Sequence, residues 1–353
     1  MPDWSPQDPL REASRRCLDC PIDRGKMSRS ELTMRDIYEA QRRIAGIAIR
    51  TPLIEAPALA ERVGALVYLK LENLQPTGAF KIRGAANKLL SLSDEERGRG
   101  VITVSSGNHG RAVGYVARRL GVRAVVCMSA HVPRHKADAI RNLGAEVILE
   151  GESYQAAEQV ALDLEERLGL TLIPPFDDPD VIAGQGTIGL ELVEELPALD
   201  TVVVPLSGGG LLSGIALAVK SADPRIQVVG VSMERAPVMF HSLKAGQPIE
   251  MEEEKTLADA LVGGIGLDNR YTFEMVKAYA DETLLVTEEE IADAMAFAFN
   301  SHRLVLEGGG AVALAAILHG KTKTTGQCAA LVISGGNVEM PILAKIAGAR
   351  LEC

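Results

Sequence analysis

Apolar and polar residues follow two patterns along the chain, one typical of strands and one typical of helices. Short apolar runs predict strands at 66–71, 101–104, 124–128, 146–149, 172–173, 201–205, 227–231, 283–286 and 329–333. Apolar residues that recur every three or four positions predict helices at 34–45, 56–63, 111–120, 133–143, 153–168, 182–196, 212–221, 288–301, 311–318 and 340–349. The predicted strands and helices alternate along the chain, and this alternation predicts a mainly parallel sheet with helices on both faces. So many strands exceed one open sheet, and we therefore expect two α/β domains.

Three segments do not follow this alternation. Residues 1–33 are polar, contain several prolines and show no periodic pattern, so we expect a poorly ordered N-terminal extension. Residues 239–270 are less regular than the segments around them. The boundary between the two domains rests on the pattern alone, and we place it near Pro174 to Pro179.

The composition fits a large globular protein and argues against two classes of partner. With 353 residues, 47% of them hydrophobic, the chain can bury one large core or two moderate ones. The net charge is -10, there is no basic stripe and only 4% of residues are aromatic, so we expect no nucleic-acid partner. The uncharged stretch from 202 to 219 contains Pro205 and several glycines, so we expect no membrane span.

The N-terminus and the cysteines indicate a cytoplasmic protein. The first residues contain no apolar core for a signal peptide and too many acidic residues for a transit peptide. Five cysteines at irregular spacing predict reduced thiols. Cys17 and Cys20 form a lone C-x-x-C without the second pair that a zinc site needs, so we predict no metal site.

One lysine lies where a helix begins, after a segment that breaks the chain. In Gln75-Pro-Thr-Gly-Ala-Phe-Lys-Ile-Arg-Gly84, proline and glycine end the preceding element, and a helical apolar pattern starts at Ile82. Lys81 lies at the edge of that apolar face, where partial burial lowers the pKa of an amine. A neutral amine is a nucleophile that can form a Schiff base. Taken alone, however, Lys81 is better explained as a surface lysine whose apolar stem covers the core while its charged end stays in water.

Three polar, glycine-rich loops follow predicted strands, at the edge where open parallel sheets bind ligands. Ser207-Gly-Gly-Gly210 offers converging N–H groups at a helix start, which suits a phosphate, although a closely packed glycine turn explains it equally well. Ser105-Ser-Gly-Asn-His-Gly110 offers groups that can bind a carboxylate or a ring hydroxyl, more than helix capping needs. Ser334-Gly-Gly-Asn337 places a hydroxyl at a third strand end. A nucleophilic lysine, a phosphate cradle and a carboxylate loop together match pyridoxal phosphate (PLP).

The motifs resemble those of fold-type II pyridoxal-phosphate enzymes, in particular the family of threonine/serine dehydratases and serine racemases. They are Thr77-Gly-Ala-Phe-Lys-Ile-Arg-Gly84, Ser105-Ser-Gly-Asn-His-Gly110, Ser207-Gly-Gly-Gly-Leu211 and Ser334-Gly-Gly-Asn337, in the family's order. The resemblance extends over roughly residues 34–348.

The resemblance implies an architecture and an assembly. The fold would be tryptophan synthase β-subunit-like, an α/β fold of two three-layer α/β/α domains. Residues 34–99 and 178–353 would form the large PLP-binding domain, and residues 100–177 the small domain. The family resemblance also implies a homodimer.

The resemblance implies a role for each residue of the motifs. The cofactor-binding residues would be Phe80, Lys81, Asn108, Ser207, Gly208, Gly209, Gly210, Leu211, Glu307 and Ser334. The substrate carboxylate would be bound by Ser105, Ser106, Gly107, Asn108 and His109. Lys81 would carry the Schiff base and take the α-proton, and Ser106 matches the acid/base residue of the racemases. Phe80 would pack on the cofactor ring, Asn108 would hydrogen-bond to the ring hydroxyl and Ser334 would face the pyridine nitrogen.

The implied reaction is the loss of water and ammonia from a small-molecule β-hydroxy amino acid such as threonine or serine, which leaves a 2-oxo acid. Racemisation of serine, β-replacement, and a hydroxyectoine-derived or 3-hydroxyaspartate-type substrate are the alternatives. Ser232 and Val238 stand where eukaryotic-type racemases carry acidic cation ligands, so no metal is expected there. Glu307-Gly-Gly-Gly310 replaces the usual Pro-Ala/Ser-Gly turn and resembles dehydratases of hydroxyectoine breakdown. A dinucleotide-binding module without activity is a further alternative, although Ser213 stands where its motif needs glycine or alanine.

Overall fold

The computed structural model describes residues 32–322 and 328–350. Nearly all of the extension predicted at residues 1–33 lies outside these ranges, as do Cys17 and Cys20. The strands are β1 (Leu53–Glu55), β2 (Leu66–Leu71), β3 (Val101–Val104), β4 (Ala124–Met128), β5 (Glu146–Leu149), β6 (Thr171–Leu172), β7 (Thr201–Pro205), β8 (Gln227–Met233), β9 (Glu282–Val286) and β10 (Cys328–Ile333).

Helices connect these strands. They are α2 (Met34–Arg43), α3 (Pro57–Val63), η1 (Glu72–Leu74), α4 (Lys81–Ser91), α5 (Asp94–Arg99), α6 (Asn108–Leu120), α7 (Arg134–Asn142), α8 (Tyr154–Leu168), α9 (Pro179–Glu195), α10 (Gly210–Ala222), α11 (Val238–Ala245), η2 (Asp259–Leu261), α12 (Thr272–Tyr279), α13 (Glu288–His302), α14 (Gly308–Leu318) and α15 (Met340–Ala349). None of the helices in the described ranges is long and apolar enough to cross a bilayer.

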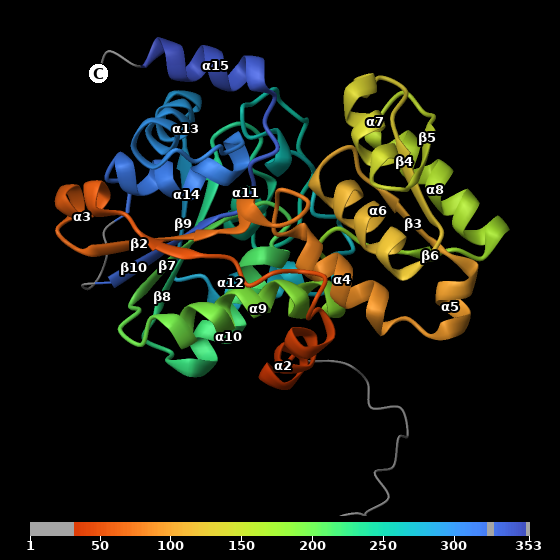
Figure 1. The fold of residues 1–353 in the computed structure, drawn as a ribbon, viewed down its shortest axis with the longest axis horizontal. Helices are drawn as coiled ribbons and strands as arrows, with labels where there is room; N and C mark the ends of the chain where they lie inside the picture. The colour runs from red at the N-terminus through yellow and green to blue at the C-terminus, as the bar shows by residue number, and fades with distance from the viewer. Residues whose placement is uncertain (1–31, 323–327, 351–353) are drawn as a thin grey trace, which may run out of the picture. The chain divides into compact units, whose positions relative to one another are not determined.

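Two sheets organise the described residues (Figure 1). The larger sheet has the strand order β1-β2-β10-β7-β8-β9, and the smaller one has the order β5-β4-β3-β6. Every neighbouring pair is parallel except β1 with β2. The predicted α/β fold with two largely parallel sheets is therefore confirmed.

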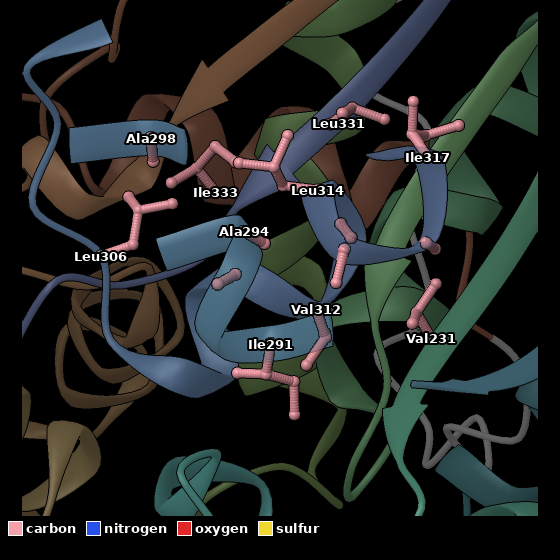
Figure 2. Packing of buried hydrophobic residues seen from close by; sticks show 14 of the residues in the cluster. Val231, Ile291, Ala294, Ala298, Leu306, Val312, Leu314, Ile317, Leu331 and Ile333 are labelled. Carbon is pink, nitrogen blue, oxygen red and sulfur yellow. The ribbon is translucent and has the colours of Figure 1, made fainter. Parts of the chain in front are cut away.

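Successive residues of the central strands point into cores on opposite faces of the larger sheet. Val202 and Val204 of β7 pack with α9 and α10, whereas Val203 packs with α13 and α14. Figure 2 shows the second core, in which Leu331 and Ile333 of β10 lie against α13 and α14. All five side chains are fully buried, which is why these strands are apolar without alternation.

The smaller sheet is covered in the same way. Val126 of β4 belongs to a core with α6 and α7, and its neighbours Val125 and Cys127 belong to a core with α8. The smaller sheet takes all its strands from residues 101–172, and the larger takes its strands from both sides of that segment. Residues from Thr33 onward cluster as one compact unit, so the domain boundaries stay a prediction.

Four helices begin earlier than the apolar pattern predicts, and one of them is α9, which begins at Pro179 rather than at 182. Helix α6 begins at Asn108 rather than at 111, α10 at Gly210 rather than at 212, and α14 at Gly308 rather than at 311. Helix α6 begins with Asn-His-Gly, α10 with Gly210 and α14 with three glycines, so these first residues add nothing to the apolar periodicity although their backbone is helical. The N-terminal N–H groups of α6 and α10 therefore lie inside two of the loops that are predicted to bind ligands.

The pattern also misses six short elements: β1, α5, α11, α12 and the two 3-10 helices η1 and η2. Helix α5 has a usable signal, because Ser93 and Glu96 form a capping box at its start.

Helices α9 and α10 approach each other closely at Gly186 and Gly214, where a larger side chain would not fit. This contact predicts how a substitution there would affect stability. A Cβ at Gly214 would lie 2.5 Å from the backbone nitrogen of Gly186. We expect Gly214→Ala to lower the free energy of unfolding by about 1–3 kcal/mol. The same substitution at Gly98, inside α5 with no atom within 4 Å of an added Cβ, should stabilise by about 0.5–1 kcal/mol. Urea unfolding measures both, and equal effects would contradict the packing argument.

Candidate active site

A cavity of about 1800 Å³ lies at the carboxyl ends of β3 and β4 of one sheet and β7 and β10 of the other. Every residue predicted from the sequence for the site lines this cavity: Phe80, Lys81, Ser105, Ser106, Gly107, Asn108, His109, Ser207, Gly208, Gly209, Gly210, Leu211, Glu307 and Ser334. Segments up to about 250 residues apart in sequence therefore meet at one place, as expected for parallel sheets.

Lys81 is the first residue of α4 and reaches into the cavity. Its Nζ donates a hydrogen bond to the carbonyl of Pro175 at 2.6 Å. Burial lowers the pKa of this amine to about 8. At neutral pH a larger fraction of this amine is therefore neutral and nucleophilic than for an ordinary lysine.

Helix α4 is held in place by buried charges that the sequence pattern did not indicate. Arg83 is only 1% exposed and bridges Glu72 of η1 and Glu191 of α9, at 2.7 and 2.6 Å. Lys70 of β2 lies 2.7 Å from Glu191 and donates to the carbonyl of Thr51 at 2.7 Å. The buried members of the network are two cations and two anions, so the charge that they bury is balanced, and the partly exposed Glu195 lies 3.7 Å from Lys70 at its edge. The network anchors the helical turn that begins with Lys81.

The glycine loop after β7 has the form of an anion cradle. Gly209 has a φ of 86° and precedes the first turn of α10, which has no side-chain cap. A Cβ at Gly208 would overlap the ring of Phe176, so the loop backbone lies against that ring. Unpaired N–H groups and the helix dipole together favour a phosphate at this point. The hydroxyl of Ser207 donates to the carbonyl of Leu261 at 2.8 Å.

The loop after β3 leads directly into α6. The Ser105 hydroxyl accepts a hydrogen bond from the N–H of Gly107 at 3.2 Å, which shapes the turn. His109 is buried, and its Nε2 lies 3.0 Å from the carbonyl of Ile173. Since a carbonyl only accepts, this nitrogen carries the proton, and Nδ1 is left without a partner among the described residues. Burial and then the charge of Lys81 lower the pKa of His109 to about 3, so its ring is neutral.

A chain of polar side chains joins this loop to the other two. Asn108 donates to Glu307 at 2.6 Å and accepts from Asn337 at 2.7 Å. Burial raises the pKa of Glu307 to about 7. The Ser334 hydroxyl lies 3.4 Å from the carbonyl of Gly309. Asn337 was part of a recognised motif but was given no role, and only its contacts reveal that it belongs to the site.

Two residues that the sequence does not predict for the site also contact it: Phe176 packs against Gly208, and the carbonyl of Pro175 accepts from Lys81. They precede Asp177, whose carboxylate accepts from the N–H groups of Tyr271 and Thr272 at 2.9 Å each. No sequence signal beyond the paired prolines at 174–175 marks this segment. Within residues 32–322 and 328–350, no group of three or more His, Cys, Asp or Glu side chains is placed to hold a metal ion.

The sequence matches a family model described as "Pyridoxal-phosphate dependent enzyme" over residues 44–335. The chain belongs to the family of pyridoxal-phosphate dependent enzymes. An L-threonine ammonia-lyase of Thermotoga maritima is 46% identical over 89% of this chain and 78% of its own length. The processed form of threonine deaminase isoform 2 of Solanum lycopersicum has a TM-score of 0.83 at 33% identity, covering 96% of this chain and 95% of its own. Maize serine racemase has a TM-score of 0.84 at 35% identity, covering 91% of this chain and 98% of its own.

The residues of this PLP-dependent enzyme fit its cofactor. Gly208 to Gly210 have no side chains, so a phosphate could come close to their backbone. The N–H groups at the start of α10 have no side-chain cap and could bind it. Lys81 supplies a partly neutral amine for an aldehyde, and Phe80 adjoins it with its ring centre 5.3 Å from Nζ. Ser334 lines the same cavity and could offer a hydroxyl, rather than a carboxylate, to the pyridine nitrogen. Membership in this family leaves the dinucleotide-binding alternative without support.

Proposed function

We propose that this protein is a PLP-dependent ammonia-lyase that converts threonine or serine to the corresponding 2-oxo acid and ammonia. The observation that carries the proposal is the buried Nζ of Lys81, with its lowered pKa, in the cavity between the glycine loop and the loop after β3. The relationship to an L-threonine ammonia-lyase at 46% identity supports the same activity.

When bound, PLP supplies an aldehyde for linkage to an amine and a ring that withdraws electrons from the α-carbon. The N–H groups of Gly208 to Gly210 would bind its phosphate, and Phe80 would shield the ring from water. Lys81 would hold the cofactor and later, when its Nζ is free, take the proton from the α-carbon of the substrate.

The loop after β3 would bind and orient the substrate. Backbone N–H groups at the start of α6, with Ser105 and Ser106, would bind the carboxylate, because a helix N-terminus favours negative charge. The neutral ring of His109 carries its proton on Nε2, toward the carbonyl of Ile173, and its Nδ1 is an acceptor, so the ring cannot donate to a carboxylate. In the predicted carboxylate site, His109 would therefore contribute its backbone N–H and not its ring. The Ser334 hydroxyl would leave the pyridine nitrogen largely unprotonated, which favours elimination over transamination.

Serine racemisation is the second candidate. Ser106 lines the cavity and matches the residue that the racemases use as acid/base, and maize serine racemase has a closely similar fold. A hydroxyectoine-derived or 3-hydroxyaspartate-type substrate stays a prediction that the same substrate screen addresses.

The setting of this activity is also a proposal. A cytoplasmic protein without a nucleic-acid partner is supported by the acidic net charge of -10, the few aromatic residues and the irregular cysteines. A homodimer stays a prediction from the family resemblance, and the absence of a membrane partner stays a prediction from the proline and glycines of the uncharged stretch at 202–219. Domains at 34–99 with 178–353, and at 100–177, are supported by the separate strands of the two sheets.

One experiment separates the activities. Purified protein is incubated with L-threonine and with L-serine, and 2-oxo acid, ammonia and D-serine are measured. We expect equal amounts of 2-oxo acid and ammonia. D-serine without pyruvate would establish the racemase instead, and a product that requires added sulfide would indicate β-replacement. Preparations that bind PLP without forming any of these products would contradict the proposal.

A further inference from the structure

Glu307 occupies a place that the surrounding backbone keeps open with glycine. It precedes the first turn of α14, and its carboxylate is buried beside Gly335. A Cβ at Gly335 would overlap Oε1 of Glu307, and a Cβ at Gly310 would overlap the carbonyl oxygen of Gly335. Gly310, the last of the three glycines after Glu307, is therefore needed for the packing of Gly335 beside this carboxylate.

The orientation of the Asn108 amide follows from a chain of hydrogen bonds that starts at a backbone carbonyl. Thr77 presents its carbonyl oxygen 2.9 Å from Nδ2 of Asn337, and an oxygen of this kind only accepts. Asn337 must therefore point its NH₂ group toward both Thr77 and Asn108, so the atom of Asn108 at 2.7 Å is its acceptor Oδ1. The NH₂ group of Asn108 then faces Glu307, 2.6 Å from Oε1.

We propose that Glu307 is a positioning residue that, together with Asn337, holds the Asn108 amide so that its second N–H is presented to the ring oxygen of PLP. One N–H of Asn108 is used by Glu307 and one lone pair of its Oδ1 by Asn337, which leaves the second N–H. A donor at the ring oxygen stabilises negative charge there. This inference rests on the proposed PLP-dependent function and adds a role for residues that need not touch the substrate.

A glutamine in place of Glu307 would avoid the burial of a charge, but it would not bind both donors equally well. Burial, the largest cause, and the charge of Asp259 of η2 raise the pKa of Glu307, and the balance of all contributions leaves it at about 7. Hydrogen bonds from Asn108 and from the N–H of Asn337, and the charge of Arg111 of α6, lower it again. Two donors thus converge on one carboxyl group. Glutamine offers one acceptor oxygen and one NH₂ group, so it cannot accept from both donors as well as a carboxylate does.

The test uses the PLP-bound protein and the variant Glu307→Gln. We expect a shifted visible absorption band of the bound cofactor and about tenfold weaker PLP binding, measured by titration of cofactor-free protein. The midpoint of thermal unfolding at pH 8 should be unchanged or higher, because a buried charge is removed. A residue with a merely structural role would lower that midpoint and leave the absorption band unchanged.

A double-mutant cycle shows whether Glu307 acts through Asn108. In an Asn108→Ala background, Glu307→Gln should weaken PLP binding no further. Asn73→Ala is the matched control, since its side-chain amide also donates to a nearby carbonyl, that of Val305, but does not contact Asn108. We expect wild-type absorbance and PLP affinity from the control.

Three results would overturn the inference: a wild-type band and affinity in Glu307→Gln, an effect of the same size in Asn73→Ala, or additive effects in the cycle. Absence of PLP binding by the wild type would overturn it together with the proposed function. A wild type that binds PLP but releases no 2-oxo acid would refute the proposed function alone, because these readouts do not depend on turnover.

Discussion

The Lys81→Ala variant is expected to lose the visible absorbance of the linked cofactor and to form 2-oxo acid at least about 10³-fold more slowly than the wild type. Lys81 is the one residue proposed both to hold PLP and to move the α-proton, and its Nζ lies in the cavity with its pKa lowered to about 8 by burial. Absorbance spectra and initial rates with L-threonine measure the two effects.

Lys88 provides the control on the same helix. It pairs with Asp178 at 2.6 Å and does not line the cavity, so Lys88→Ala should keep the visible band and lose only some stability. Cofactor-free wild-type protein should regain the band faster as the pH rises through about 8, because the neutral amine is the nucleophile. Comparable activity in Lys81→Ala and Lys88→Ala would refute the role of Lys81.

The Arg83→Met variant is expected to lower the free energy of unfolding by about 3–5 kcal/mol at pH 7. It removes the cation between Glu72 and Glu191 and leaves buried carboxylates unbalanced. Burial alone would raise the pKa of Glu72, but the charge and hydrogen bonds of Arg83 hold it below its ordinary value. Denaturant unfolding measures the loss.

The pH dependence of this loss has a definite sign. In the wild type, the lowered pKa of Glu72 contributes stability above the ordinary carboxylate pKa, and this contribution disappears as the pH falls. In Arg83→Met, protonation at low pH relieves the unbalanced charge. The difference between the two proteins should therefore be smaller at pH 4 than at pH 7.

Two further variants test whether the charge balance is the cause. Adding Glu72→Gln to Arg83→Met removes one anion with the cation and leaves Lys70 paired with Glu191, so part of the lost stability should return. Arg35→Met is the matched control, because Arg35 forms an exposed ion pair with Glu39. Its loss should lower the free energy of unfolding by about 0.5 kcal/mol or less. An equally small loss at Arg83 would show that its network contributes little.

Local pattern was sufficient for most of the secondary structure. Strands β2, β3, β4 and β7 have the bounds that their apolar runs predict, because burial on both faces of a sheet leaves a continuous apolar run in the sequence itself. Helix starts were predicted less well. Helices α6, α10 and α14 each begin with glycine or polar residues, which add nothing to the apolar periodicity that predicts the rest of the helix.

The sequence by itself determined the parts of the site, namely Lys81 at a helix start and the glycine-rich loops at strand ends, because strand, turn and helix signals are local. Only the tertiary structure decided their partners. Asn108 meets Glu307 and Asn337 across separations of 199 and 229 residues, and Arg83 meets Glu191 across 108. Such pairs depend on the order of strands in the sheets, which one sequence does not encode in any local pattern. The lowered pKa of Lys81 likewise depends on burial, and the folded chain around it supplies that burial.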